Sequence, residues 1–149
     1  MALRVSSPAF SNNQPIPKKY TCDGQNVAPP LDWSDLPDEA KSVAVICDDP
    51  DAPSGTFTHW VQYNIPASEP GLAEHSTAGT PGVNSFHKSG FGGPCPPKAD
   101  HAHHYHFRVY ALNVESIGGA GLSKDDALEA MKGHILAEDD LVGLYKRAS

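Results

Sequence analysis

DPDAP at residues 49–53, followed by THW at 58–60, and GPCPP at 93–97, followed by HHY at 103–105, decide the fold of this chain. Each stretch places prolines, which fix φ and remove a backbone donor, beside aspartate or histidine. Rigid turns that present ionisable side chains commonly line a site. The sequence therefore predicts two turns that hold polar groups in place.

Three runs of residues around these turns predict β-strands. Residues 42–47 (SVAVIC) are rich in β-branched side chains and end at the first turn, and residues 58–65 (THWVQYNI) lead away from it. Residues 102–112 (AHHYHFRVYAL) follow the second turn. Strands that begin or end at these turns would bring the polar side chains to one end of a sheet.

Regular alternation predicts which side chains share a face of these strands. In the second run one face would hold His59, Val61, Tyr63 and Ile65. In the third run one face would hold His101, His103, Tyr105, Phe107 and Val109. An imidazole would then lie beside a phenol.

Only the C-terminal part of the chain looks helical. Ser123 suits an N-cap with Asp126 three residues later, and an apolar stripe follows until Gly133. Residues 135–146 predict a second helix, with apolar residues on one side and basic residues at its end. The expected fold is mainly β, a β-sandwich or similar antiparallel system with C-terminal helices, in one domain over residues 1–149.

The segment between the two turns is long and irregular. Residues 66–93 are mostly small and polar, and glycine recurs six times in them. Structureless segments of this length are uncommon in compact domains and are often binding loops or lids. A mobile surface loop is the plain alternative.

Composition limits the classes of partner. The chain has 149 residues, and its net charge of −7 includes only 11 Lys and Arg without a basic run. This composition argues against nucleic acid and against an anionic membrane surface as partners bound through electrostatic attraction. Because no stretch approaches the roughly 20 apolar residues of a spanning helix, we expect no membrane insertion and a cytoplasmic location.

The three cysteines do not describe a disulfide framework. Cys47 ends an apolar run and is expected to be a buried thiol, while Cys22 and Cys95 lie in predicted turns and their pairing stays open. A nucleophilic pair of Cys95 and His103 is a further alternative, although nothing in the sequence indicates an oxyanion hole or a lowered thiol pKa.

Four segments together resemble one known family. DPDAPSGTFTHWVQYNIP (49–66) and GPCPPKADHAHHYHFRVYALN (93–113) are similar to the two signature segments of the phosphatidylethanolamine-binding protein, or Raf kinase inhibitor protein, family. YTCDGQNVAPPLDW (20–33) and GHILAEDDLVGLYKR (133–147) resemble its bacterial and archaeal branch. The resemblance implies a Greek-key β-sandwich with C-terminal helices and a small anion-accepting pocket at one edge.

The resemblance also implies the residues of the pocket. The pocket residues that it implies are Asp49, Asp51, Pro53, His59, Pro96, Pro97, His103 and Tyr105. Gly93 is added to them because backbone N–H groups near the second turn are expected to be free. The Ala52–Pro53 bond resembles the family's cis peptide. His104 stands where the family usually has arginine, so a support behind the pocket would become titratable.

These residues suit a small anion such as a phosphate monoester. His59, His103, the Tyr105 hydroxyl and free N–H groups near Gly93 would donate hydrogen bonds to it. Asp49 and Asp51 would instead accept from imidazole and turn N–H groups. Binding should then strengthen as pH falls through the histidine pKa, ordinarily about 6.5. The alternative is that these residues have only structural roles. Both aspartates would then stabilise turns, and the histidines would be strand residues whose hydrogen bonds are made within the protein.

The favoured function is a non-enzymatic binding protein for a phosphorylated or other anionic group. The family resemblance implies a protein kinase as a partner and a homodimer. The alternative is an enzyme that acts on a small metabolite, with His59 and His103 as general acid and base. His101 and His103 suggest a metal, but no third or fourth ligand is evident, so we expect no metal and no cofactor.

Overall fold

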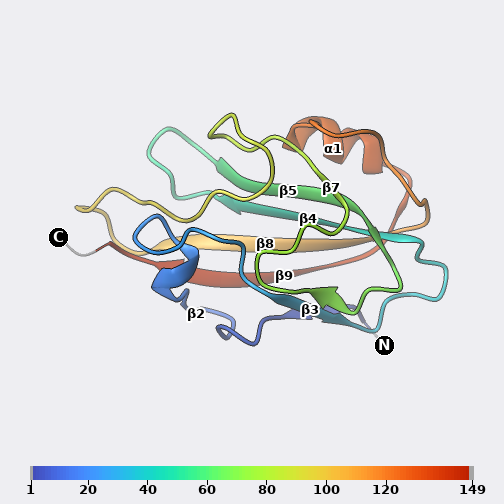
Figure 1. The fold of residues 1–149 in the computed structure, drawn as a ribbon, viewed down its shortest axis with the longest axis horizontal. Helices are drawn as coiled ribbons and strands as arrows, with labels where there is room; N and C mark the ends of the chain where they lie inside the picture. Colours follow the sequence, from blue (N-terminus) through green and yellow to red (C-terminus); the bar gives the residue numbers. More distant parts are fainter. Residues whose placement is uncertain (1, 148–149) are drawn as a thin grey trace.

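Two β-sheets face each other across a hydrophobic core in the computed structural model, which describes residues 2–147 (Figure 1). The smaller sheet has the order β1 (Arg4–Ser6), β3 (Leu31–Ser34), β6 (Gly71–Leu72). The larger sheet has the order β2 (Gln14–Pro15), β9 (Ile135–Tyr145), β8 (His103–Leu112), β4 (Ser42–Asp49), β5 (Phe57–Pro66), β7 (Thr80–Pro81). The mainly β sandwich expected from the sequence is confirmed.

The larger sheet is covered on both faces. One cluster of buried side chains joins it to the smaller sheet and includes Trp33, Val45 and Phe107. A second cluster joins its other face to the helix α1 (Lys124–Met131) and includes Tyr63 and Met131. Figure 1 accordingly shows α1 on the side of the large sheet away from β3. Because β4 is covered on both faces, all its residues are buried, as its continuous apolar run requires.

The three expected strands are present, and the chain returns from β5 to β8 by a long connection. β8 then lies beside β4, antiparallel to it, and β9 pairs with the free side of β8. A long return to an earlier strand is the crossed connection that Greek-key arrangements use. The C-terminal end of β4 and the first residues of β5 and β8 therefore meet at one end of the sheet.

The prediction that His59, Val61, Tyr63 and Ile65 share one face of β5 is wrong, because the pairing of β5 with β4 has two register shifts. Cys47 pairs with Trp60 but Asp48 pairs with Thr58, so His59 is an extra residue, and a second register shift near Asn64 follows. Asn64 has a φ of 56°, a left-handed conformation that asparagine tolerates. The first irregularity leaves His59 beside Tyr105, while Val61 and Tyr63 pack towards α1 and Ile65 packs between the sheets. On β8 the alternation of His103, Tyr105, Phe107 and Val109 is confirmed, since all four are buried and the last three lie in the inter-sheet cluster. His101, expected on the same face, precedes the strand and is exposed.

The first expected helix is confirmed and the second is wrong. Ser123 caps α1 by accepting from the Asp126 N–H at 3.1 Å, and Gly133 leaves the helix with a φ of 80°. Residues Ile135–Tyr145 form β9 rather than a helix. They pair along the whole of β8, and that pairing places Leu141 in the inter-sheet cluster. A 3₁₀ turn, η1 (Lys18–Tyr20), lies near the start of the chain.

The first turn does not contain the cis peptide that the resemblance implied. No peptide bond within residues 2–147 is cis, so Ala52–Pro53 is trans. The chain reverses instead at Gly55, which has a φ of 110° and donates its N–H to the Ala52 carbonyl at 3.0 Å. The left-handed glycine therefore closes the turn.

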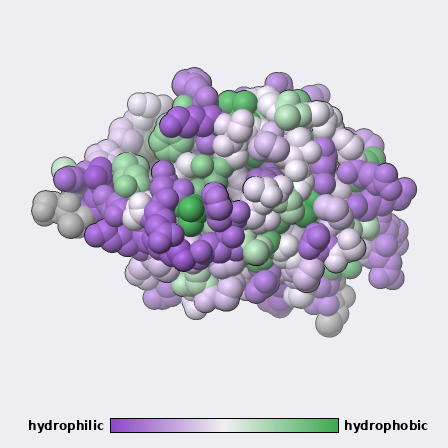
Figure 2. Space-filling model, in the orientation of Figure 1, coloured by the Kyte–Doolittle hydropathy of each residue, from purple (hydrophilic) through white to green (hydrophobic). Residues whose placement is uncertain are grey.

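The long connection between the turns is ordered by short pairings. It contains β6 and β7, and the buried Asn84 accepts from the N–H groups of Phe86 and Lys88 in a tight turn. No helix in the described part of the chain is long and apolar enough to cross a membrane. The face in Figure 2 is mostly hydrophilic or intermediate, with small separate hydrophobic areas.

Candidate ligand-binding pocket

A cavity of about 180 Å³ lies at the end of the larger sheet where β4, β5 and β8 meet. The two proline-rich turns form its walls. Its lining residues are Asp49, Ala52, Pro53, Phe57, His59, Phe86, Cys95, Pro96, Pro97, His103 and Tyr105. The sequence segments that decide the fold thus converge on one cavity.

Seven of the nine residues expected from the sequence line this cavity, and two do not. The seven are Asp49, Pro53, His59, Pro96, Pro97, His103 and Tyr105. Asp51 and Gly93 lie behind the lining and hold other parts of the site.

Asp49 and His103 form a buried pair at the base of the pocket. Asp49 Oδ2 lies 2.6 Å from His103 Nδ1, and its Oδ1 accepts from the Asp51 N–H at 2.8 Å. The Asp49 carboxylate therefore accepts from an imidazole and a turn amide, as the sequence predicted. Burial disfavours the charged form of His103, but hydrogen bonds to Asp49 and Asp100 outweigh it and raise its pKa.

The other nitrogen of His103 also meets a carboxylate. His103 Nε2 lies 2.9 Å from Oδ2 of Asp100, a residue that the sequence analysis did not single out. Asp100 follows the PP turn, where no strand or helix periodicity predicts the direction of a side chain. Both N–H groups of the charged ring are consequently in use.

His59 is oriented by the loop that covers the pocket. Its Nδ1 lies 2.8 Å from the Gly92 carbonyl oxygen. Because a carbonyl oxygen can only accept a hydrogen bond, Nδ1 must carry the proton. The neutral ring is therefore protonated at Nδ1, and Nε2 is its acceptor. Burial lowers the pKa of His59, against the opposing effect of the Gly92 carbonyl. The ring also contacts Phe57, Phe86 and Tyr105.

Tyr105 brings an unpaired hydroxyl to the pocket. Its Oη is buried and has no hydrogen-bond partner among residues 2–147. Burial, and then the nearby charge of Asp49, raise its pKa, so the group remains a neutral O–H donor. Buried hydroxyls usually have a partner, so an unpaired one beside a cavity calls for a ligand or a water molecule.

The backbone N–H groups of Gly92 and Gly93, expected to be free for an anion, are already bonded. The Gly92 N–H donates to the His59 carbonyl at 2.8 Å, and the Gly93 N–H donates to Asn26 Oδ1 at 2.7 Å. These bonds hold the loop against β5 and against the segment before β3. The Gly93 N–H, which was expected to donate to the ligand, is therefore already occupied in this structure.

Asp51 braces the first turn from outside the cavity. Its Oδ2 accepts from the backbone N–H of His104 at 2.8 Å and from the His104 ring Nδ1 at 2.7 Å. Burial disfavours the Asp51 carboxylate, but the two bonds from His104 outweigh this and lower its pKa. His104 thus supports the pocket from behind, at the position where the resemblance suggested a titratable support.

The cysteine pair that the sequence left open is a disulfide. Cys22 and Cys95 are joined with a Cα–Cα separation of 5.4 Å, and the Cys22 N–H donates to the Pro94 carbonyl at 3.1 Å. A nucleophilic Cys95 is therefore excluded in this state, because its sulfur is already bonded. Cys47 is free and buried, as expected. Across residues 2–147, no three His, Cys, Asp or Glu side chains come together as a metal site requires.

Two aromatic residues of the pocket were missed from the sequence. Phe57 and Phe86 lie edge to face with ring centroids 4.8 Å apart, and both contact the His59 ring. Phe86 is 39% exposed, which is unusual for its size, and it forms the lip of the cavity. The sequence signal that could have indicated Phe86 is a large apolar residue within a long loop of small and polar residues.

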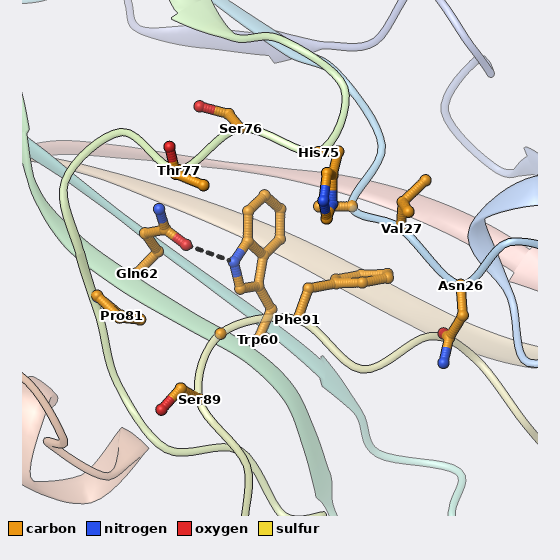
Figure 3. Close-up of a pocket in the computed structure, with 12 residues that line it drawn as sticks. Asn26, Val27, Trp60, Gln62, His75, Ser76, Thr77, Pro81, Ser89 and Phe91 are labelled. Atoms are coloured by element: carbon orange, nitrogen blue, oxygen red, sulfur yellow. Dashed lines mark hydrogen bonds between the residues drawn. The ribbon is translucent and has the colours of Figure 1, made fainter.

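A second cavity, of about 340 Å³, is lined by residues of β5 and of the long connection that follows it, together with residues 26–28 (Figure 3). In it the Trp60 indole N–H donates to Gln62 Oε1 at 3.0 Å, and Phe91 lies edge-on to the indole. None of its twelve lining residues is Lys, Arg, Asp or Glu. Its lining therefore offers no fixed charge to an ionic ligand. Its wall includes Phe91, next to the Gly92 that orients His59.

Comparison with known proteins agrees with this fold. The architecture is that of a β-sandwich protein with a small ligand pocket at one sheet end. Residues 6–146 match the family model described as "Phosphatidylethanolamine-binding protein", and the chain belongs to this family.

Relatives span the full length of the chain. A UPF0098 protein of Methanothermobacter thermautotrophicus is 47% identical over 97% of this chain and 99% of its own length. The crystal structure of a putative phosphatidylethanolamine-binding protein homolog, CT736 of Chlamydia trachomatis, is 42% identical with a TM-score of 0.93, covering 98% of each chain. E. coli YbcL, described as a member of the mammalian family, is 31% identical with a TM-score of 0.91, covering 99% of each chain.

Proposed function

We propose that the pocket binds a small anionic ligand that carries a phosphate-type group. The observation that carries this proposal is the buried Tyr105 hydroxyl, which has no partner among residues 2–147 and lies beside a histidine whose pKa is raised. A phosphate oxygen accepts from both kinds of donor. A hydroxyl that is buried without a partner costs roughly 1–3 kcal/mol, so a ligand that pairs with it recovers part of that cost.

The remaining groups specify the protonation of the ligand. His59 donates to Gly92 through Nδ1, so its neutral ring offers an acceptor at Nε2. A singly protonated phosphate monoester supplies a hydroxyl for that acceptor and oxyanions for the donors. The apolar walls, which include Pro53, Phe57 and Pro96, exclude water and strengthen these bonds.

The proposal concerns the phosphorylated group rather than the molecule that carries it. Modulation of a protein kinase and a homodimeric state follow from the family resemblance alone and stay predictions. The cytoplasmic location also stays a prediction, and the Cys22–Cys95 disulfide counts against a strongly reducing compartment.

The test is an NMR titration of ¹⁵N-labelled protein with inorganic phosphate and with phosphoethanolamine, near pH 6.5 and near pH 8. We expect saturable shifts around residues 49–59 and 93–105 that disappear in His59→Ala. Because the pKa of His103 is raised above 6.5, its charge is lost only as pH rises through that higher value. Affinity should therefore be higher near pH 6.5, and an absence of shifts at both pH values would reject the proposal.

Turnover separates this binding function from the enzyme alternative. A binding protein leaves phosphoethanolamine unchanged after hours of incubation, as followed by ³¹P NMR. Release of inorganic phosphate that is lost in His59→Ala and in His103→Ala would instead assign the pocket to acid–base catalysis.

A further inference from the structure

The hydrogen bonds of His103 are fully used before any ligand binds. An imidazolium has two N–H donors, and here Nδ1 meets Asp49 at 2.6 Å and Nε2 meets Asp100 at 2.9 Å. For His103 to donate to a bound anion, one of the two carboxylates must leave.

The two carboxylates are anchored very differently. The Asp49 side chain is 4% exposed and holds the Asp51 N–H as well as His103. The Asp100 side chain is 35% exposed, and within residues 2–147 it bonds only to His103. Asp100 lies on a turn that its own N–H closes by donating to the Pro97 carbonyl. A rotation of its side chain alone would return the carboxylate to water, so Asp100 is the one that can be displaced.

We propose that Asp100 is a built-in competitor of the ligand: its carboxylate, which meets His103 outside the cavity lining, occupies the Nε2 N–H that His103 would otherwise donate to the bound anion. This inference rests on the proposed anion pocket and adds its regulation. Ligand binding is then an exchange, in which a carboxylate tethered three residues from the histidine leaves as the anion enters.

The charges of the site favour this exchange over simple addition. With Asp100 in place, two carboxylates face one imidazolium, which leaves one net negative charge against an incoming anion. Once Asp100 turns outward, water and salt screen it, and the Asp49–His103 pair is neutral.

The exchange also selects the class of ligand. A simple carboxylate would only replace the bond that Asp100 already makes, and a tethered group competes at high local concentration. A phosphate group gains more, because its further oxygens reach the unpaired Tyr105 hydroxyl and the His59 ring. The wild-type pocket should therefore prefer phosphate to acetate, and the loss of Asp100 should weaken that preference.

The test compares wild type with Asp100→Asn, titrated with inorganic phosphate and with acetate by calorimetry at constant ionic strength, near pH 6, which is below the raised pKa of His103 in wild type. Asp100→Asn should bind phosphate about tenfold more tightly, since the competing bond becomes neutral, and should bind acetate measurably. Asp38→Asn, which removes an exposed carboxylate elsewhere, should change phosphate affinity less than twofold. Asp100→Ala repeats the test with a side chain that cannot bond to His103.

A ligand-free measurement tests the contact itself. The ¹⁵N shift of His103 Nε2 should change in Asp100→Asn without any anion present, and an unchanged shift would reject the contact. Equal or weaker phosphate binding by both Asp100 variants, beside saturable binding by wild type, would overturn the competition and leave the proposed function standing. If no variant binds phosphate, the proposed function fails and the competition is rejected with it.

Discussion

At the scale of single residues, a substitution of Tyr105 should affect the stability of the fold and the binding of phosphate differently. The Tyr105 hydroxyl is buried and has no partner in the described part of the chain, whereas the Tyr63 hydroxyl donates to the Gly119 carbonyl at 2.6 Å and accepts from the Leu122 N–H at 3.1 Å. Tyr105→Phe should leave the free energy of unfolding unchanged or raise it by up to about 3 kcal/mol, because an unpaired polar group is removed. It should also weaken phosphate binding.

The matched control is Tyr63→Phe, which removes a satisfied hydroxyl from the opposite side of the larger sheet. Urea unfolding should show a loss of about 1–2 kcal/mol for this variant, with phosphate affinity unchanged. A loss of stability in Tyr105→Phe as large as in Tyr63→Phe would mean that the Tyr105 hydroxyl has a partner in solution even without a ligand.

At the scale of elements, the wall of the pocket depends on a contact between distant segments. The Cys22–Cys95 disulfide closes a separation of 73 residues, and the bond from Gly93 to Asn26 reinforces it. Replacing both cysteines by serine should cost up to about 4.4 kcal/mol, the value that the chain-entropy model gives for a loop of this length. Because Cys95 lines the cavity beside Pro96 and Pro97, phosphate affinity should fall as well.

Thermal unfolding with and without dithiothreitol measures this contribution. Wild-type Tm should fall on reduction to that of the Cys22→Ser/Cys95→Ser variant, whose own Tm should not respond to the reductant. Cys47→Ala, which changes the free thiol, should keep the response of wild type. If the Tm of wild type does not change when the disulfide is completely reduced, the disulfide does not stabilise the wall of the pocket.

The elements also show which parts of the fold the sequence predicts. The strands beside the turns follow from β-branched runs and alternation, and alternation places His103 and Tyr105 together. The face of His59 could not be predicted, because an extra residue in β5 is decided by its pairing with β4. Alternation assumes a regular register, which a bulge breaks.

The C-terminal strand was mistaken for a helix for a related reason. Residues 135–146 contain Leu, Ala and Glu, which favour helices in isolation, but β8 has an edge that needs a partner. Gly143 has no room for a side chain, since a Cβ there would lie 2.4 Å from Ile16. Such a close approach is a tertiary property. Asp100 escaped prediction because loop residues have no periodicity to follow.

At the scale of the whole molecule, charge opposes the approach to an anionic membrane. The chain has 18 acidic and 11 basic residues, and the face in Figure 2 has only small separate hydrophobic areas. Each basic residue near an anionic bilayer is worth about 1 kcal/mol, so a net charge of −7 works against binding. The pocket, of about 180 Å³, suits a head group rather than acyl chains.

We therefore expect little sedimentation of the protein with vesicles of phosphatidylethanolamine and phosphatidylglycerol at physiological salt. Any residual binding should rise as salt is added, because added salt shortens the Debye length, about 8 Å at physiological ionic strength, and screens the repulsion. Free phosphoethanolamine, titrated in the same buffer, is the control for a functional pocket. Strong pelleting that decreases with salt would reveal an attraction between the protein surface and the bilayer and would contradict this prediction.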